Sequence, residues 1–304
     1  MLNASNFSLL GFVLTAFAGN SILNRLALQN FDQAGYSIDP SSFTFVRLFS
    51  GALMLSLLVA LSGKKLLKPT SIHYRGALCL FIYAITFSYA YISLDAAVGA
   101  LILFGTVQIS ILGIAIFRGK HLNRFEWLGC AMAILGLLVL TLPNVFTTPF
   151  STTLSDETVS SIQAPTNSIV LMVIAGIAWG LFTVNGAGSK QPLIDTANCF
   201  VLSVPIMLLI IVMVAVMKMV IISPYGVFLG IVSGAITSGL GYAMWYKLLP
   251  KLTSSQAASS QLLVPIITSF AGVLLLDEML NLSFIFAASL TISGVFLVIK
   301  GSSR

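Results

Sequence analysis

The sequence predicts an all-α integral membrane protein with ten transmembrane helices, arranged as two inverted repeats of five. Three observations predict this fold class. Apolar residues make up 58% of the 304-residue chain and charged residues only 8%, with a mean hydropathy of +1.02, whereas a soluble domain has roughly a quarter charged residues. The apolar residues fall into ten long runs, and the two halves of the chain resemble each other. A bilayer surrounds apolar surface that a soluble protein of this length could not bury.

Each of the ten apolar runs is long enough to cross a membrane, since a transmembrane helix needs about 20 residues. The runs are continuous rather than alternating, which favours helices over the strands of a barrel. The predicted spans are 7–28, 43–62, 73–92, 95–117, 124–142, 168–188, 197–217, 224–246, 253–276 and 282–300.

The charged residues between the spans predict an orientation. With the N-terminus in the cytoplasm, 12 of the 15 Lys and Arg residues fall in cytoplasmic segments or span ends, as the positive-inside rule requires. The three exceptions are Arg25, Arg47 and Lys218. We therefore expect both termini in the cytoplasm and the chain in the inner (plasma) membrane of a bacterium. The net charge of +6 forms no basic face, so no nucleic-acid partner is expected.

An internal repeat divides the chain into two halves. Residues 118–140 align with residues 276–298, so that Gly136 falls on Gly294, and the first span aligns with the sixth. The alternative is a chance match between apolar stretches. Because five is an odd number, repeats of five spans enter the membrane in opposite directions, as in many secondary transporters. The predicted units are the first repeat, the Ser/Thr-rich external linker and the second repeat, at 1–145, 146–166 and 167–304.

No pattern in the chain indicates a catalytic, metal or cofactor site. The cysteines, Cys79, Cys130 and Cys199, lie in separate apolar runs without metal-ligand or disulfide spacing. The nucleotide-binding motif GxxxxGK[ST] and the hydrolase motifs HExxH and GxSxG are missing, so an enzyme is not expected. The two histidines, His73 and His121, are expected at cytoplasmic span ends, in contact with water or lipid headgroups.

Polar and aromatic side chains inside the spans are the candidates for solute binding. Polar groups within a membrane are costly, so they face a cavity or one another. The candidate substrate-binding residues are Asn20, Asn24, Tyr83, Gln108, Trp179, Tyr242, Gln256 and Gln261.

The alternatives for these residues are structural. Asn20 and Asn24 share one helix face, where they could bind a polar solute or hydrogen-bond to a neighbouring helix. The three glutamines each bring donors and an acceptor into apolar surroundings. Tyr83 and Tyr242 lie deep enough to stack on a solute, whereas Trp179 either lines the pathway or packs against other helices.

Two arginines and three aromatic residues have simpler expected roles. Arg47 has no acid at i±3 or i±4, so it is tied to helix-end carbonyls or to an outer-loop acid, or else binds substrate. Arg25 is expected to extend to the outer surface. Tyr91, Trp245 and Tyr246 lie near span ends, where aromatic residues often anchor a protein at the membrane interface.

Several segments give the chain a resemblance to a known family over nearly its whole length. The features that carry it are Arg47, GKHLNRFEWLG at 119–129, Trp179-Gly180, and Pro265 followed by Asp277-Glu278. With these features the chain resembles the EamA-type branch of the drug/metabolite transporter superfamily, although Val107 and Lys120 stand where that family usually has Pro and Glu.

The resemblance implies ten helices around a central cavity, lined mainly by the first, third, fourth, sixth, eighth and ninth spans. Members of the family move amino acids, other metabolites or drugs, mostly outward. The expected function is therefore secondary transport of amino-acid-like or drug-like solutes by alternating access, with uptake or exchange as the alternative and a membrane-embedded enzyme less favoured. The expected partners are a small-molecule substrate and the lipid bilayer, and a homodimer is left open.

Overall fold

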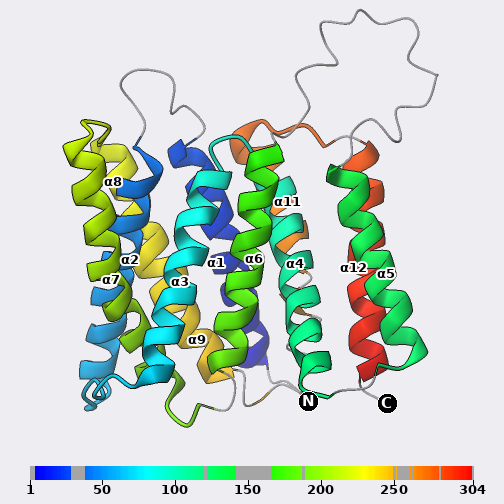
Figure 1. Ribbon diagram of the computed structural model, residues 1–304, viewed down its shortest axis with the longest axis horizontal. Helices are drawn as coiled ribbons and strands as arrows, with labels where there is room; N and C mark the ends of the chain where they lie inside the picture. Colours follow the sequence, from blue (N-terminus) through cyan, green and yellow to red (C-terminus); the bar gives the residue numbers. More distant parts are fainter. Residues whose placement is uncertain are drawn as a thin grey trace, which may run out of the picture.

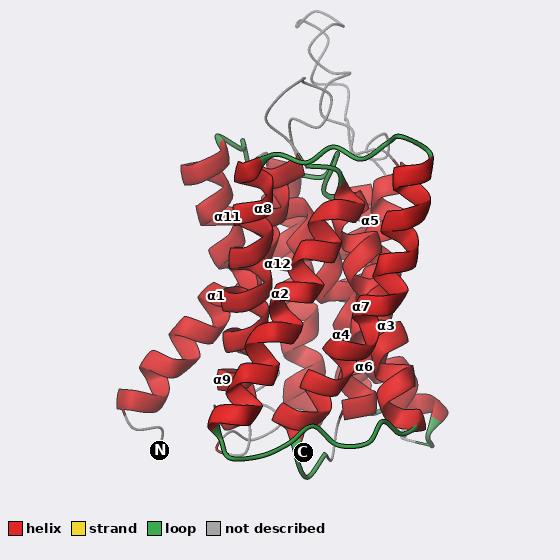
Figure 2. Cartoon of the chain, turned by 90° about the vertical axis from the view of Figure 1, so that its left-hand side faces the viewer, coloured by secondary structure: helices red, strands yellow, loops and turns green. Residues whose placement is uncertain are grey.

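The computed structural model describes residues 4–28, 38–119, 122–141, 166–186, 189–248, 251, 260–261, 263–280 and 282–302. All regular structure within these ranges is helical (Figure 2). Six of the described helices are long and apolar enough to cross a membrane. The elements are α1 (Ala4–Leu28), α2 (Pro40–Leu61), α3 (Ser71–Ala90), α4 (Ala96–Phe117), α5 (Arg124–Thr141), α6 (Thr166–Gly186), α7 (Pro192–Val216), α8 (Pro224–Ile231), the π-helix η1 (Val232–Leu240), α9 (Gly241–Leu248), α11 (Leu263–Leu276) and α12 (Leu282–Ser302).

The described helices form ten upright spans, because α8, η1 and α9 follow one another as a single span (Figure 1). Both termini lie at one end of the molecule, which we call the termini end; the other end is the distal end. Successive spans alternate in direction, so α1 runs away from the termini end and α6 runs back towards it. The two sets of five spans are therefore inverted with respect to each other, as the repeat predicts.

Capping residues start several helices before the apolar runs begin. At α2, Asp39 Oδ1 accepts a hydrogen bond from Ser42 N at 2.9 Å, and Pro40 occupies the first helical position. Pro40 precedes the predicted start at 43, and Pro192 likewise starts α7 before the predicted 197. The difference arises because hydropathy marks the buried part of a helix, whereas a cap and a proline mark its first turn.

The eighth span is not a continuous α-helix. Nine residues, Val232–Leu240, form a π-helix, whose i→i+5 hydrogen bonds make each turn wider than an α-helical turn. Gly234 in this segment lies against the backbone of α2 at Arg47. A π-helical segment within a longer helix is often found at a functional site. Its wider turn changes the directions in which the side chains point.

The helices divide into a central group and a side pair. The main cluster of buried apolar side chains joins α1, α2, α3, α4, α6, α7, α8, α9 and α11. To one side, α5 packs on α12 (Figure 1), and Gly129 and Gly294 allow their backbones to approach closely. The centre of the molecule is consequently formed by helices of both halves.

Candidate functional site

A small cavity lies at the centre of the molecule, between helices of the two halves. Its volume is about 20 Å³, which is room for about one water molecule. This space is too small for a metabolite. Its lining residues are Phe17, Asn20 and Ser21 of α1, Tyr83 and Phe87 of α3, Leu103 and Phe104 of α4, Trp179 of α6 and Tyr242 of α9.

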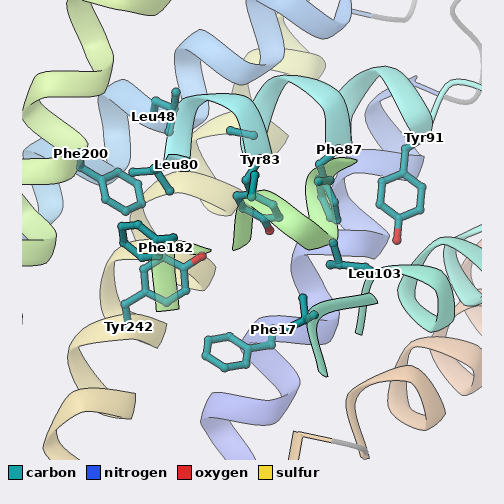
Figure 3. Close-up of a cluster of buried hydrophobic side chains, with 14 of the residues drawn as sticks. Phe17, Leu48, Leu80, Tyr83, Phe87, Tyr91, Leu103, Phe182, Phe200 and Tyr242 are labelled. Atoms are coloured by element: carbon teal, nitrogen blue, oxygen red, sulfur yellow. The ribbon is translucent and has the colours of Figure 1, made fainter. Parts of the chain in front are cut away.

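Aromatic rings make up most of the cavity wall. Trp179 is the central ring, with its centroid 4.8 Å from that of Tyr83 and 5.3 Å from that of Tyr242. Tyr83 and Phe87 extend side by side from α3, with Phe17 of α1 facing them (Figure 3). Rings at these separations attract one another and also offer flat apolar faces to a solute.

Asn20 is the main polar group of the cavity, and η1 holds it in place. Its Oδ1 atom accepts hydrogen bonds from Thr237 Oγ1 at 2.6 Å, Ser233 Oγ at 2.9 Å and Ser238 Oγ at 3.4 Å. The wide turn of the π-helix brings positions 233, 237 and 238 to one face, which allows all three hydroxyls to converge. The amide oxygen is thus fully used by protein, whereas the described residues give Asn20 Nδ2 no hydrogen-bond partner.

Asn24 has a different environment from Asn20. Its Nδ2 atom donates to Asn20 O at 3.0 Å, and its Oδ1 atom accepts from Ser88 Oγ at 2.9 Å. Ser88 Oγ in turn accepts from Thr44 Oγ1 at 2.9 Å. Asn24 is fully buried and joins α1 to α3, and through Ser88 to α2. These contacts correspond to the interhelical alternative for this residue.

The structure brings half of the sequence-predicted site residues together. Asn20, Tyr83, Trp179 and Tyr242 line the same cavity, and Asn24 lies one turn away from it. Gln108 and Gln261 are half-buried and do not line it. Gln256 lies outside the described residues.

Five lining residues were missing from the sequence-based candidates: Phe17, Ser21, Phe87, Leu103 and Phe104. Phe17 is three residues before Asn20, and Phe87 is four residues after Tyr83, so each shares a helix face with a candidate, a signal that the sequence does contain. Leu103 and Phe104 have no such signal, because α4 is mostly apolar and its polar residue Gln108 does not line the cavity. No group of three described His, Cys, Asp or Glu side chains is placed to hold a metal ion.

An ionic network lies at the distal end of the molecule. Arg25 Nη2 lies 3.2 Å from Asp95 Oδ1, and Arg25 Nη1 donates to the backbone oxygens of Tyr91 and Ile92. Glu278 accepts hydrogen bonds from Ala96 N at 2.6 Å and Ala97 N at 3.3 Å, and its Oε1 is 3.9 Å from Arg25 Nε.

Glu278 lies in the loop between α11 and α12, where burial raises the pKa of its carboxyl group above the ordinary range. Nearby Asp95 acts in the same direction, whereas the two backbone N–H groups and Arg25 lower this pKa. The network therefore joins α1, α3 and α4 of the first half to the second half.

A second polar network lies at the termini end of the molecule. His73 Nε2 lies 3.0 Å from Asp195 Oδ1, and Asp195 Oδ2 accepts a hydrogen bond from Ser189 Oγ. Thr70 N donates to His73 Nδ1 at 3.0 Å, so in the neutral ring the proton sits on Nε2 and is donated to Asp195. A cavity of about 150 Å³ adjoins this network, and Phe182 and Tyr246 form part of its wall.

Comparison with known proteins gives one family and several relatives. The sequence profile of the EamA-like transporter family matches residues 7–142 and 166–300. An uncharacterised protein of Pseudomonas aeruginosa is 40% identical over 286 residues, which cover 94% of this chain and 91% of that protein. YoaV of Bacillus subtilis, an uncharacterised transporter, is 21% identical over 86% of this chain and 88% of its own.

One solved crystal structure resembles the fold, with a TM-score of 0.59 and 14% sequence identity. The match covers 93% of this chain and 98% of that chain. It supports the helix arrangement over the full length of both chains.

Proposed function

Because the chain belongs to the EamA-like transporter family, and is thus an integral membrane transporter of the drug/metabolite type, we propose that it is a secondary carrier working by alternating access. The central cavity is the observation that carries the proposal. Its walls come from both inverted halves, so a rocking motion of one half against the other would open it to each side in turn. The family and the relatives named as transporters point to transport rather than to an enzyme activity.

Two polar networks, one at each end of the molecule, support this mechanism, and we assign to them the closing of the cavity. The distal network depends on Arg25 and Glu278, and the termini-end network on His73 and Asp195. Each consists of polar contacts between helices, which can separate and form again more readily than a packed apolar core. In the cycle that we propose, one network breaks while the other holds, and the solute crosses between them.

We further propose that the solutes are small metabolites, amino-acid-like or drug-like, and that net movement is outward. The proposed location is the bacterial inner membrane, with the termini end in the cytoplasm. A homodimer is compatible with this arrangement. Uptake or exchange would use the same cavity, and the direction of the gradient distinguishes these cases.

Flux through the cavity is tested with the purified chain in liposomes, against amino acids, nucleosides and dyes. We expect at least one class of solute to move faster than in protein-free liposomes. The replacement Trp179→Leu removes the central ring of the wall and should lower the initial rate roughly tenfold. Trp127→Leu is the matched control, since Trp127 is largely exposed on α5. Absence of flux for every class, or equal rates in the two variants, would contradict the proposal.

The orientation is tested by cysteine labelling in a variant without the native cysteines. Lys64 is exposed in the loop between α2 and α3 at the termini end, and Ile222 is exposed in the loop between α7 and α8 at the distal end. We expect an impermeant thiol reagent applied to intact cells to label Ile222→Cys and not Lys64→Cys. Labelling of Lys64→Cys from outside would reverse the proposed orientation.

A further inference from the structure

Arg47 is a charged side chain deep inside the membrane part of the molecule. It lies seven residues after Pro40, roughly 10 Å along α2 at about 1.5 Å per residue. Only 2% of its surface is exposed. An ionised group in such a place is costly unless it is paired, and in membrane proteins it marks a functional site more often than not.

The protein satisfies the Arg47 guanidinium only in part. Nη2 donates to Tyr83 Oη at 3.1 Å, and Nε donates to Ser238 Oγ at 3.4 Å. Its central carbon lies 5.4 Å from the ring centroid of Tyr83 and 5.2 Å from that of Phe87. Among the described residues Nη1 has no hydrogen-bond partner, although the Tyr242 hydroxyl lies near the guanidinium, and no carboxylate forms a salt bridge with Arg47. The site is thus short of one acceptor and of one negative charge.

Three residues that line the central cavity also lie against Arg47. The guanidinium is close to the rings of Tyr83 and Phe87, and the Tyr242 hydroxyl lies near it. Rotation of these side chains would bring the guanidinium to the cavity surface. Asn20 lies on the same side and is linked to Arg47 through Ser238, whose Oγ accepts from Arg47 Nε.

The nitrogen groups without a partner at this place are donors. Among the described residues, Arg47 Nη1 and Asn20 Nδ2 have no hydrogen-bond acceptor, and the guanidinium has no carboxylate partner. A carboxylate is acceptor-only and negatively charged, and it matches the flat fork of an arginine. A primary amine could bond to the tyrosine hydroxyls, but its positive charge would be repelled by the guanidinium. The aromatic walls suit an apolar remainder of the solute rather than a second charged group.

We propose that Arg47 and Asn20 recognise the carboxylate of the transported solute, and that the aromatic wall holds an apolar or aromatic remainder. This inference rests on the carrier function proposed above and narrows its substrates to apolar monocarboxylates. Tyr83 and Phe87 cover the guanidinium in the closed state and move aside when the solute binds.

Binding is measured by the fluorescence of Trp179, the only tryptophan left when Trp127 and Trp245 are replaced by phenylalanine. The probes are 3-phenylpropionate and 3-phenylpropylamine, which share the ring and chain and differ in the charged group. We expect saturable quenching or enhancement with the carboxylate and none with the amine. Arg47→Gln should weaken carboxylate binding about tenfold or more, and Arg47→Lys should weaken it less. Arg75→Gln, at an exposed position of α3, is the matched control and should bind like the parent protein.

Thermal unfolding of the unsubstituted protein gives a test that does not depend on the folding of any variant. The melting temperature should rise with 3-phenylpropionate and not with 3-phenylpropylamine, because a ligand stabilises only the state that binds it. Equal effects of both probes, binding of neither, or unchanged carboxylate binding by Arg47→Gln would overturn the inference.

Liposome flux distinguishes failure of the carboxylate site from failure of the proposed carrier function. If amines or neutral solutes move and Arg47→Gln does not matter, the carrier function stands and the carboxylate site fails. If carboxylates bind but no solute crosses, the carrier function fails instead.

Discussion

Replacing Gly234 with alanine is expected to remove most of the transport activity. A methyl group at this position would overlap Ser50 Oγ and the carbonyl oxygen of Arg47. The added methyl carbon would also lie only 2.9 Å from the carbonyl carbon of Arg47. A side chain can rotate, but the α2 backbone cannot, so η1 must move away from α2. Overpacking of this kind typically destabilises a protein by about 1–3 kcal/mol.

The displacement would also reach the cavity. Ser233, Thr237 and Ser238 hold Asn20 from the same segment, and Ser238 also contacts Arg47. We therefore expect the initial rate of solute flux to fall roughly tenfold or more, together with a lower melting temperature.

The matched control for Gly234→Ala is Gly113→Ala in α4, where an added methyl group would meet nothing within 4 Å. Alanine stabilises a helix by about 1 kcal/mol relative to glycine, so this variant should be at least as stable as the parent and equally active. A Gly234→Ala protein with normal flux would show that the close contact between η1 and α2 is not required for transport.

Replacing Glu278 with alanine is expected to weaken the distal closure, whereas glutamine should preserve it. The alanine variant leaves the N–H groups of Ala96 and Ala97 without their acceptor at the start of α4. Loss of such a capping acceptor costs about 1–2 kcal/mol, and Arg25 would also lose one of its two carboxylate neighbours. Glutamine keeps an oxygen that can accept from Ala96 N.

The pH dependence separates the charge of Glu278 from its role as an acceptor. Because burial raises the pKa of Glu278 in the folded protein, the ionised form is disfavoured there relative to the unfolded chain. The energetic cost of burying the ionised carboxylate applies above the folded-state pKa of Glu278. This cost decreases as the pH falls from the folded-state pKa towards the ordinary pKa of glutamate. The contribution of Glu278 to stability should therefore increase with falling pH in this window and be absent in Glu278→Gln.

Melting temperatures of the parent and of both variants across this pH window check the prediction. At neutral pH we expect Glu278→Gln to be at least as stable as the parent and Glu278→Ala to be less stable. Asp277→Asn is the control, because Asp277 is exposed and its positive φ of 54° is a conformation that asparagine tolerates. A Glu278→Gln protein that is as unstable as Glu278→Ala would mean that the charge, rather than the acceptor oxygen, holds the closure.

Part of the candidate site could be predicted because certain polar or bulky aromatic residues stand inside apolar spans, away from the span ends. Asn20 is polar inside an apolar span, and Tyr83, Trp179 and Tyr242 are bulky and lie away from span ends; all four line the cavity. Asn24 satisfied the same criterion, yet its donors and acceptor are taken up by Asn20 O and Ser88. Sequence spacing shows that two asparagines share a face, but only the neighbouring helices decide which of them meets a cavity.

Other interpretations from the sequence were wrong because they assigned lipid or water as the neighbour. His73 is buried against Asp195, 122 residues away in the chain, rather than in contact with solvent. Tyr91 is fully buried, so it does not anchor the protein at the membrane interface. In each case the residue lies near the end of a span, where lipid, water and a second helix are all available.

The sequence by itself determined the membrane-spanning class, the number of spans and their alternating direction. These properties follow from the length and composition of continuous segments, because each span must satisfy its own backbone hydrogen bonds in lipid. The tertiary structure decided which polar side chains pair, where the cavity lies and which polar networks form at the two ends of the molecule. The partners of Arg47, His73 and Glu278 come from distant segments, and short-range contacts between side chains depend on how the helices are packed rather than on the order of residues within any one of them.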